Sequence, residues 1–217
     1  MIIVNFKTYE SAIGENAVAL AKIHEVVAKE TGAEIAVAVN ALDLEKVATA
    51  VKIPVFAQHV DAAGFGSFTG SIPPALVKKM GAAGTLLNHS EKRLDEKLAE
   101  CVTAAKAAGL KVVVCAEDDT EAEKIAAELQ PDFVAVEPPE LIGGEVSVTN
   151  ANPEIVENSV KKVGATPLLV GAGVKNSEDV KIALKLGAKG VLLASGVTKA
   201  ENPTDVLRDL ASGLLDN

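Results

Sequence analysis

Eight short apolar runs, each separated from the next by a longer segment, place the strongest constraint on how this chain can fold. The runs are rich in valine, isoleucine and leucine, as in strands buried on both faces of a parallel sheet. In several of the intervening segments apolar residues recur every three or four positions, which is typical of helices that pack one face on a sheet. The runs are residues 2–6, 34–39, 54–60, 84–88, 111–116, 132–137, 167–171 and 190–195. This alternation predicts consecutive βα units around a parallel sheet.

Four of the helical segments end in the same way, with a lysine near the end and a glycine shortly before the next strand. A lysine in the last turn interacts favourably with the negative end of the helix dipole, and glycine readily adopts the left-handed conformation that ends a helix. The glycines are Gly32, Gly81, Gly109 and Gly187. The shared ending indicates that one structural unit is repeated along the chain.

No linker, low-complexity tract or shift in composition divides this series. With 217 residues, 48% of them hydrophobic, the chain is long enough to bury one large core. We therefore expect a single domain over residues 1–217 with an α/β fold, a (β/α)8 TIM barrel with shortened helices. The alternative is an open doubly wound sheet, which usually carries a GxGxxG motif or a P-loop, and the sequence contains neither.

Composition excludes several classes of protein. The chain has 21 basic and 30 acidic side chains, a net charge of −9, and no basic run that would bind nucleic acid or an acidic membrane. No apolar run reaches the roughly 20 residues that span a bilayer, and the N-terminal sequence does not resemble a secretory signal. Cys101 and Cys115 lack metal-ligand spacing, so we expect packing roles and neither a disulfide nor a metal site. These features predict a cytoplasmic protein without nucleic-acid or membrane partners.

Polar residues follow several of the predicted strands, where barrel enzymes carry their catalytic groups. They are Asn5 and Lys7 after the first strand, residues 88–91 after the fourth, Glu137 after the sixth, and glycine-containing turns after the seventh and eighth. A lysine, a histidine and a carboxylate at one barrel mouth can bind an anion, polarise a carbonyl and move a proton. The turns add backbone N–H donors.

Five of these segments together resemble the triosephosphate isomerase family. They fall in the family's order at the ends of strands 1, 4, 6, 7 and 8, and the resemblance covers essentially the whole chain. The segments are "NFKTY" (5–9), "NHSEKR" (88–93), "VEPPELIGG" (136–144), "VGAGV" (170–174) and "LLASGVTKA" (192–200). The short length and "PPELIG", where many members have a tryptophan-containing lid, are similar to the compact archaeal branch.

The resemblance implies an isomerase of glycolysis and gluconeogenesis that interconverts dihydroxyacetone phosphate and D-glyceraldehyde 3-phosphate without a cofactor or metal. It implies that Glu137 is the base that moves a proton between neighbouring carbons. It also implies that His89 is a neutral imidazole that hydrogen-bonds the enediolate oxygens, helped by a helix expected to begin just after it. Lys7 would supply a fixed positive charge, Asn5 would orient the groups beside it, and Glu91 is expected near Lys7.

The resemblance further implies that the substrate phosphate is bound by backbone N–H groups. The residues concerned are Ile142, Gly143, Gly173, Ala194 and Ser195. The segment after Glu137 would act as a lid. Its two prolines would stiffen the first hinge, and Gly143 and Gly144 would let the backbone bend as the lid shuts.

The segment "DAAGFGSFTGSIPP", residues 61–74, is long and glycine-rich for a connection between a strand and a helix. It resembles the family's protruding third loop, which docks into a pocket of a second subunit. The resemblance implies that Thr69 lies near the partner's Asn5 and Lys7, and that the chain forms a homodimer or homotetramer.

Two alternatives remain open at this point. Another phosphate-binding barrel, such as a phosphosugar epimerase or isomerase, would share the fold, but such enzymes usually carry aspartates or metal-binding histidines at other strand ends. A catalytically idle barrel that only binds phosphate would not need Asn5, Lys7, His89 and Glu137 together. His24 and His59 are interpreted as structural residues.

Overall fold

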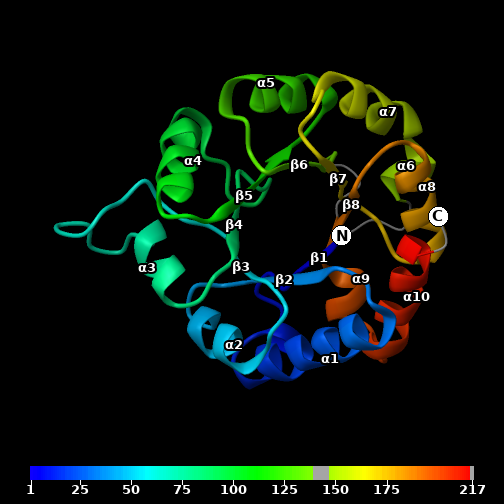
Figure 1. Cartoon of the computed structure of the whole chain (residues 1–217), viewed down its shortest axis with the longest axis horizontal. Coiled ribbons are helices and arrows are strands. Elements are labelled where there is room, and N and C mark those ends of the chain that lie inside the picture. The colour runs from blue at the N-terminus through cyan, green and yellow to red at the C-terminus, as the bar shows by residue number, and fades with distance from the viewer. Residues whose placement is uncertain (139–146, 216–217) are drawn as a thin grey trace.

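The computed structural model describes residues 1–138 and 147–215 of the chain. Eight parallel strands form a closed barrel in chain order, with β8 hydrogen-bonded to β1 (Figure 1). The strands are β1 Ile2–Asn5, β2 Ile35–Val39, β3 Val55–Ala57, β4 Gly84–Leu87, β5 Lys111–Ala116, β6 Phe133–Val136, β7 Leu168–Val170 and β8 Gly190–Leu193. The predicted (β/α)8 barrel is confirmed, and each strand lies within its predicted range.

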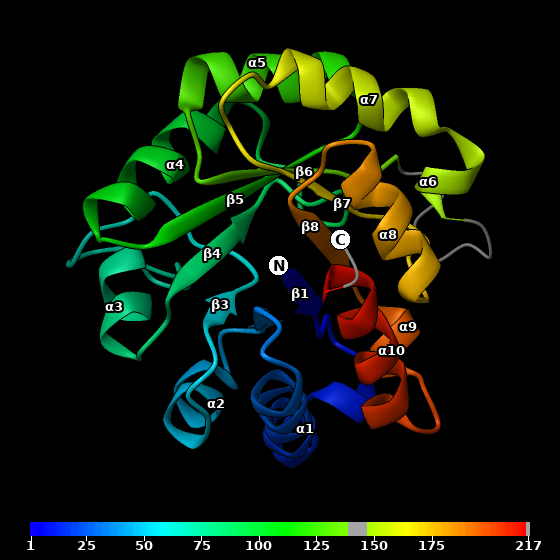
Figure 2. The same ribbon diagram turned by 45° about the vertical axis from the view of Figure 1, so that its right-hand side comes forward.

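The helices form an outer ring around the barrel (Figures 1 and 2). They are α1 Glu15–Thr31, α2 Leu44–Ala50, α3 Pro74–Lys79, α4 Leu98–Ala107, α5 Asp119–Leu129, α6 Val148–Ala151, α7 Pro153–Lys162, α8 Ser177–Lys185, α9 Ser195–Thr198 and α10 Pro203–Leu215, with 3₁₀ turns η1 Glu10–Ala12 and η2 Asp95–Lys97. The last helix, α10, packs against both α1 and α8 and so closes the ring. In the described parts of the chain, no helix is long and apolar enough to cross a membrane.

The helix endings match the repeated pattern of the sequence. All four glycines, Gly32, Gly81, Gly109 and Gly187, have a positive φ, between 74° and 101°. Lysines occupy the last turns of α1, α3, α4 and α8. Local sequence therefore ends these four helices, which explains why the strands that follow them begin where expected.

Alternate residues of the strands face either the barrel interior or the helices. The interior is filled by Ile3, Ala36, Ala38, Phe56, Leu86, Val113, Cys115, Ala135, Leu169 and Leu192. Their strand neighbours, such as Ile2 and Val4, belong to the larger cluster between strands and helices. Because the interior is a packed core, functional groups are confined to the ends of the strands.

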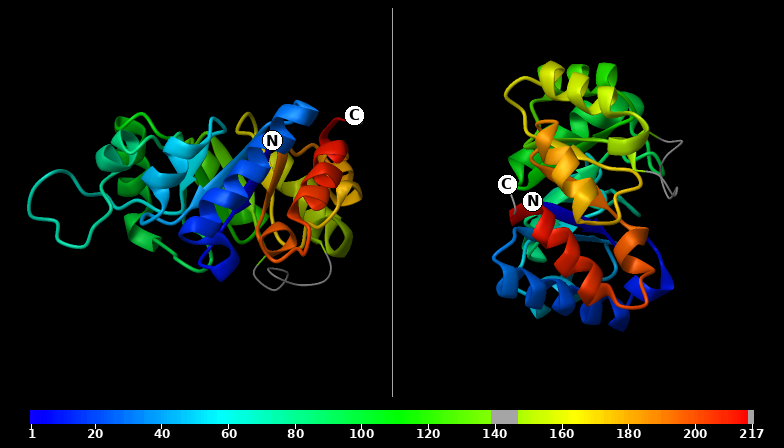
Figure 3. Two further views of the ribbon diagram at one scale, coloured as in Figure 1. Left: turned by 90° about the horizontal axis from the view of Figure 1, so that it is seen from below. Right: turned by 90° about the vertical axis from the view of Figure 1, so that its right-hand side faces the viewer.

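The connection between β3 and α3 projects from the body of the barrel (Figures 1 and 3). Its base is closed by two backbone N–H groups, since Asp61 donates to the Ile72 carbonyl at 2.9 Å and Ile72 donates to Asp61 Oδ2 at 2.7 Å. His59 Nε2 lies 2.9 Å from Asp61 Oδ1. Burial raises the pKa of Asp61, but the hydrogen bonds from His59 and Ile72 outweigh burial, and the pKa is lowered overall. The loop is thus tied at its base and exposed at its tip.

Candidate active site

The carboxyl ends of β1, β4, β6, β7 and β8 meet around one small cavity of about 40 Å³. It is lined by Asn5, Lys7, Tyr9, His89, Glu137, residues 172–175 and residues 192–196. The barrel therefore brings the polar residues that follow strands 1, 4 and 6 to the same place as the glycine-containing turns that follow strands 7 and 8. Of the predicted phosphate-binding residues, Gly173, Ala194 and Ser195 line this cavity.

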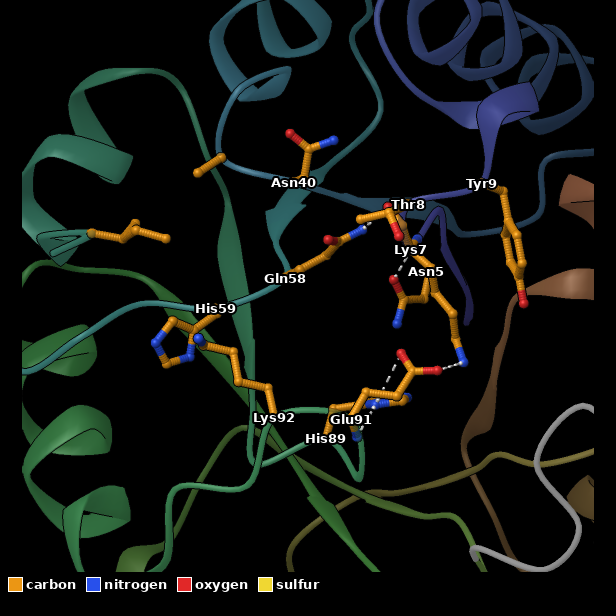
Figure 4. A pocket seen from close by; sticks show the side chains of 12 residues that line it. Asn5, Lys7, Thr8, Tyr9, Asn40, Gln58, His59, His89, Glu91 and Lys92 are labelled. Carbon is orange, nitrogen blue, oxygen red and sulfur yellow. Dashed lines mark hydrogen bonds and ion pairs between the residues drawn. The ribbon is translucent and has the colours of Figure 1, made fainter. Parts of the chain in front are cut away.

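A larger cavity of about 540 Å³ adjoins the small one at the ends of the first four strands (Figure 4). The two cavities share Asn5, Lys7, Tyr9 and His89. The larger one is also lined by Thr8, Asn40, Ala41, Gln58, His59, Ile72, Glu91 and Lys92. It is open, most of the residues that line it carry a polar group, and the projecting loop begins at its edge with His59.

Lys7 is held in the left-handed region, with φ of 48°. A residue with a side chain pays roughly 1–2 kcal/mol for this conformation, so surrounding contacts must stabilise it. The Lys7 N–H donates to Asn5 Oδ1 at 3.0 Å, and the Gln58 side-chain amide donates to the Lys7 carbonyl at 3.0 Å. The ammonium nitrogen of Lys7 lies 2.7 Å from Glu91 Oε1 (Figure 4). These contacts fix a positive charge at the mouth.

His89 is buried, and its hydrogen bond defines its tautomer. The Glu91 N–H donates to His89 Nδ1 at 3.1 Å, so this nitrogen carries no hydrogen and the neutral ring is protonated at Nε2. The Glu91 carboxylate is 3.7 Å from Nδ1, too far for a hydrogen bond. His89 Nε2 lies 3.6 Å from Glu137 Oε2. The N–H of the ring therefore faces the carboxylate across the small cavity.

The expectation that a helix begins just after His89 is wrong. Residues 90–92 form a turn, the 3₁₀ turn η2 begins at Asp95, and α4 begins at Leu98. The sequence after His89 is rich in helix-forming residues, but the Asn88 side chain accepts the Leu94 N–H at 3.1 Å and holds the intervening residues in a loop. The hydrogen bond that fixes the tautomer of His89 therefore comes from this loop and not from a helix N-terminus.

The residue before His89 is anchored by a polar network. Asn88 has φ of 62°, and its side-chain amide donates to the Cys115 carbonyl at 3.1 Å and to Glu121 Oε1 at 3.3 Å. Arg93 forms an ion pair with Glu121 through two nitrogens. Burial raises the pKa of Glu121, but the hydrogen bonds with Arg93 and its charge outweigh burial and lower the pKa overall. This network fixes the direction in which His89 leaves β4.

Glu137 follows β6 and is buried, with its backbone N–H donated to the Ala116 carbonyl at 2.9 Å. Its Oε2 atom has no hydrogen-bond partner among the described residues. Burial raises the pKa of the neighbouring Cys115 thiol well above its usual value, and the Glu137 charge adds to this rise. Cys115 is therefore a protonated packing residue and not a nucleophile, as expected from the sequence.

The β7 and β8 sides of the cavity are built from backbone. Ala172 and Gly173 have φ of 68° and 72°, and Ala194 caps the four-residue helix α9. The first N–H groups of a helix have no partner within it, and Ser195 begins this helix beside the cavity. Ile142, Gly143 and Gly144 lie outside the described residues.

Some residues of the mouth were missed by sequence reasoning. Gln58, Tyr9 and Lys175 line the cavities but were not predicted. Gln58 directly follows β3, but the third run was predicted to extend to residue 60, which placed Gln58 inside a strand. Thr69 is exposed on the projecting loop and does not reach the mouth of its own chain.

Taken together, a closed (β/α)8 barrel with a buried carboxylate, a histidine held by a hydrogen bond at Nδ1, a fixed lysine and glycine-containing turns at one mouth defines a proton-transferring barrel enzyme. Residues 1–210 match the model of the triosephosphate isomerase family. The chain is 45% identical to the triosephosphate isomerase of Methanosarcina acetivorans over 214 residues, 96% of each protein. It is 48% identical to that of Methanoculleus marisnigri (97% of each) and 49% identical to that of Archaeoglobus fulgidus (99% of this chain, 98% of the relative). The chain belongs to the triosephosphate isomerase family.

Proposed function

We propose that this chain interconverts dihydroxyacetone phosphate and D-glyceraldehyde 3-phosphate, with Glu137 as the base and His89 as the electrophile. The reaction serves glycolysis in one direction and gluconeogenesis in the other. It needs a proton acceptor, a hydrogen-bond donor for a developing oxyanion, and exclusion of water. Family membership supports the substrate, and the geometry of the mouth supports the roles of individual residues.

In the forward direction, the Glu137 carboxylate removes a proton from C1 of dihydroxyacetone phosphate. The electron pair forms the C1–C2 double bond of an enediolate, and the carbonyl π electrons move to the oxygen on C2. His89 Nε2–H and the Lys7 ammonium stabilise that oxygen. His89 transfers the hydroxyl proton from the oxygen on C1 to the oxygen on C2, and Glu137 returns its proton to C2, which gives the aldehyde.

One observation carries this proposal: Glu137 Oε2 and His89 Nε2 face each other at 3.6 Å, and the imidazole is fixed as the Nε2–H tautomer. A base and a hydrogen-bond donor in this arrangement can act on two adjacent atoms of one small molecule. Lys7 lines the same cavity and adds the positive charge. The idle barrel is disfavoured because it would have no use for an unpaired buried carboxylate oxygen beside a tautomer-fixed histidine.

The test is a coupled assay with glyceraldehyde 3-phosphate on the wild type and Glu137→Gln. The amide keeps the shape of the side chain but cannot accept the proton, so kcat should fall at least ~10²- to 10⁴-fold. Glu96→Gln, on the exposed turn η2, is the matched control and should keep wild-type kinetics. No turnover by the wild type, or retention of more than a few per cent by Glu137→Gln, would contradict the proposed mechanism.

We propose that the substrate phosphate binds to backbone N–H groups of Gly173, Ala194 and Ser195, together with residues 142 and 143. The left-handed backbone at Gly173 and the first turn of α9 support this, since both line the small cavity and such backbone can offer N–H donors to an anion. The division of roles predicts that changes here act mainly on KM.

We also propose that the chain self-associates as a homodimer or homotetramer through the projecting loop. Phe65 and Phe68 on this loop are 69% and 46% exposed, and Leu42, beside the large cavity, is 96% exposed. Large apolar side chains at such exposure are typical of contact surfaces. The loop of a second copy, including Thr69, would cover the open cavity of about 540 Å³ next to Asn5 and Lys7.

Sedimentation velocity at micromolar concentration tests the association. Phe68→Glu should shift the protein towards the monomer and lower its activity, because it places a charge in the apolar contact. Val26→Glu, at an exposed valine on the outer ring in α1, is the control. A fully active wild-type monomer would refute the role of the loop.

A cytoplasmic location remains part of this proposal. The place of the reaction in central metabolism supports it. Fractionation of the source cells with an antibody against the chain would test it, and recovery outside the cytoplasm would contradict it.

A further inference from the structure

The side chain of Glu137 lies directly against the backbone of Gly171, the residue that follows β7. A Cβ atom added at residue 171 would lie 2.2 Å from Glu137 Cγ, 2.6 Å from Oε1 and 2.7 Å from Cδ. Non-bonded carbon atoms pack at about 3.5–4.0 Å. Any residue other than glycine at 171 is therefore incompatible with this position of the Glu137 side chain.

The backbone itself does not require a glycine here. Gly171 lies outside the positive-φ region, in contrast to Ala172 and Gly173 that follow it. Its N–H donates to the Val136 carbonyl at 2.9 Å, an ordinary link to the neighbouring strand. The three atoms nearest to the added Cβ all belong to Glu137. The steric demand at residue 171 thus comes from the glutamate.

We propose that Gly171 is a positioning residue for the base: its missing side chain creates a bay that holds the Glu137 carboxylate opposite His89. This inference rests on the proposed function, in which Glu137 takes the substrate proton. The bay is walled on another side by the buried thiol of Cys115, which interacts with the carboxylate. Within it, Oε2 faces His89 Nε2 at 3.6 Å.

A methyl group at residue 171 would turn the glutamate side chain out of the bay, because the clash is with a flexible side chain and not with backbone. Proton abstraction depends on the distance and direction of the carboxylate, and a displacement of about 1 Å can lower the rate roughly 10²-fold. Phosphate binding uses other groups of the mouth. The expected signature of Gly171→Ala is thus a loss in kcat with little change in KM.

A double-mutant cycle tests the contact directly, with Gly171→Ala, Glu137→Ala and the combination of both. In the wild-type background, Gly171→Ala should lower kcat by about 10- to 100-fold and change KM for glyceraldehyde 3-phosphate by less than about threefold. It should also lower Tm by roughly 3–6 °C, as expected for crowding of a packed site. In the Glu137→Ala background the same substitution should leave Tm unchanged or raise it, since the methyl group then occupies free space.

An equal loss of Tm in both backgrounds would overturn the proposal, because glycine would then be needed by the backbone. A kcat of Gly171→Ala within twofold of the wild type, or above it, would also overturn it. If the single variant does not fold, folding of the double variant supports the bay, and failure of both to fold refutes it.

The stability measurements separate this inference from the proposed function. If Glu137→Gln kept wild-type activity, Glu137 would not be the base and the proposed mechanism would fail. The change in sign of the Tm effect between the two backgrounds would still report whether Gly171 accommodates Glu137.

Discussion

The two sides of the barrel mouth differ in what they present to the cavity. The side formed by β1 to β4 carries long polar side chains around about 540 Å³ of space, and these include Lys7, Gln58 and Glu91. The side formed by β7 and β8 presents backbone and small residues, such as Gly173 and Ser195, around about 40 Å³. The first side can place charges and the second can let a ligand approach the main chain closely. In the proposed mechanism, recognition of the phosphate and stabilisation of the developing charge are thereby separated in space.

The difference also shows how each side is stabilised. On the first side, Lys7 and Asn88 adopt left-handed conformations that are unfavourable for residues with side chains. Lys7 accepts a hydrogen bond from Gln58 and Asn88 donates one to Glu121, and these bonds hold the two residues. On the second side, the left-handed positions are Ala172 and Gly173, small residues in a short turn. Glu137 is a charged group from the β6 end, and it fits beside the second side because Gly171 has no side chain.

The strongest test of this comparison is removal of the charge from the first side. Lys7→Met keeps the length of the side chain but removes the ammonium group, so kcat/KM should fall roughly 10²- to 10³-fold, as for loss of an oxyanion donor. Steady-state kinetics with glyceraldehyde 3-phosphate would measure this loss. Lys92→Met, at a lysine lining only the larger cavity, should change kcat/KM by less than about threefold. Similar losses in both variants would refute a specific role for Lys7.

A second test concerns His24, which packs behind the first side of the mouth. His24 on α1 is fully buried against the Phe6 ring, at 5.4 Å between centroids, and Phe6 directly precedes Lys7. Burial lowers the pKa of His24 to about 4, although its hydrogen bond to the Leu20 carbonyl acts in the opposite direction. This pKa is below the value near 6.5 in the unfolded chain. The contribution of His24 to the free energy of unfolding is therefore complete above pH 6.5 and is lost as the pH falls towards 4. The free energy of unfolding should decrease by about 2 kcal/mol between pH 7.5 and pH 5.

Urea unfolding of the wild type and His24→Leu at these two pH values checks this prediction. Leucine does not titrate, so the variant should lack this part of the pH dependence. Asp61 and Glu121 have lowered pKa values and lose their contributions only below about pH 4.5, outside the range measured. Equal pH dependence in the two proteins would show that His24 is not the titrating group.

The backbone side of the mouth can be tested at Gly173. Its φ of 72° is unfavourable for alanine by roughly 1–2 kcal/mol. Gly173→Ala should therefore raise KM about tenfold, with kcat reduced less than threefold. Inhibition by inorganic phosphate should weaken by a similar factor, measured as the inhibition constant in the same assay. A loss confined to kcat would contradict the separation of the two sides.

The smallest expected effect is at Gln58, which donates a hydrogen bond to the Lys7 carbonyl. Gln58→Leu removes this bond, worth about 1 kcal/mol, so kcat should fall about three- to fivefold through a less well-fixed Lys7. KM and phosphate inhibition should stay near the wild-type values, which distinguishes this change from that at Gly173. Unchanged kcat would show that Asn5 and Glu91 fix Lys7 without Gln58.

The fold could be predicted because its determinants are local. Strands buried on both faces read as continuous apolar runs, and glycines such as Gly32 and Gly109 end helices at fixed offsets before them. The end of the third strand was predicted less accurately. The third run was predicted to continue to residue 60, but β3 ends at Ala57, where Gln58 turns to bind the Lys7 carbonyl.

The candidate site could be predicted only as a set of positions. Asn5, Lys7, His89 and Glu137 stand at the ends of strands, which sequence can locate, and the barrel brings them together. Their orientations could not be predicted, because they depend on residues far away in the chain. The loop after His89, for example, is set by a network that joins Asn88 to β5 and α5, and the sequence of this loop alone favours a helix.

The glycines of the β7 turn give the clearest example of this limit. In the sequence, Gly171 ends the seventh apolar run and Gly173 lies two residues later in the predicted phosphate-binding turn, and nothing in the pattern indicates a contact with Glu137. In the structure, Gly173 has the left-handed backbone, whereas Gly171 adjoins the side chain of Glu137. Residue 171 must be glycine because of its contact with Glu137, which lies 34 positions earlier in the sequence at the end of the neighbouring strand.

The bay at Gly171 has a consequence for the evolution of this barrel. A descendant that replaced Glu137 by a smaller residue would no longer select against alanine at position 171, and the extra methyl group would even improve packing. Once that alanine was fixed, restoring the glutamate alone would not restore the enzyme, because the methyl group would exclude it. The two positions must therefore revert together, so loss of the isomerase activity by this route is far easier than its recovery.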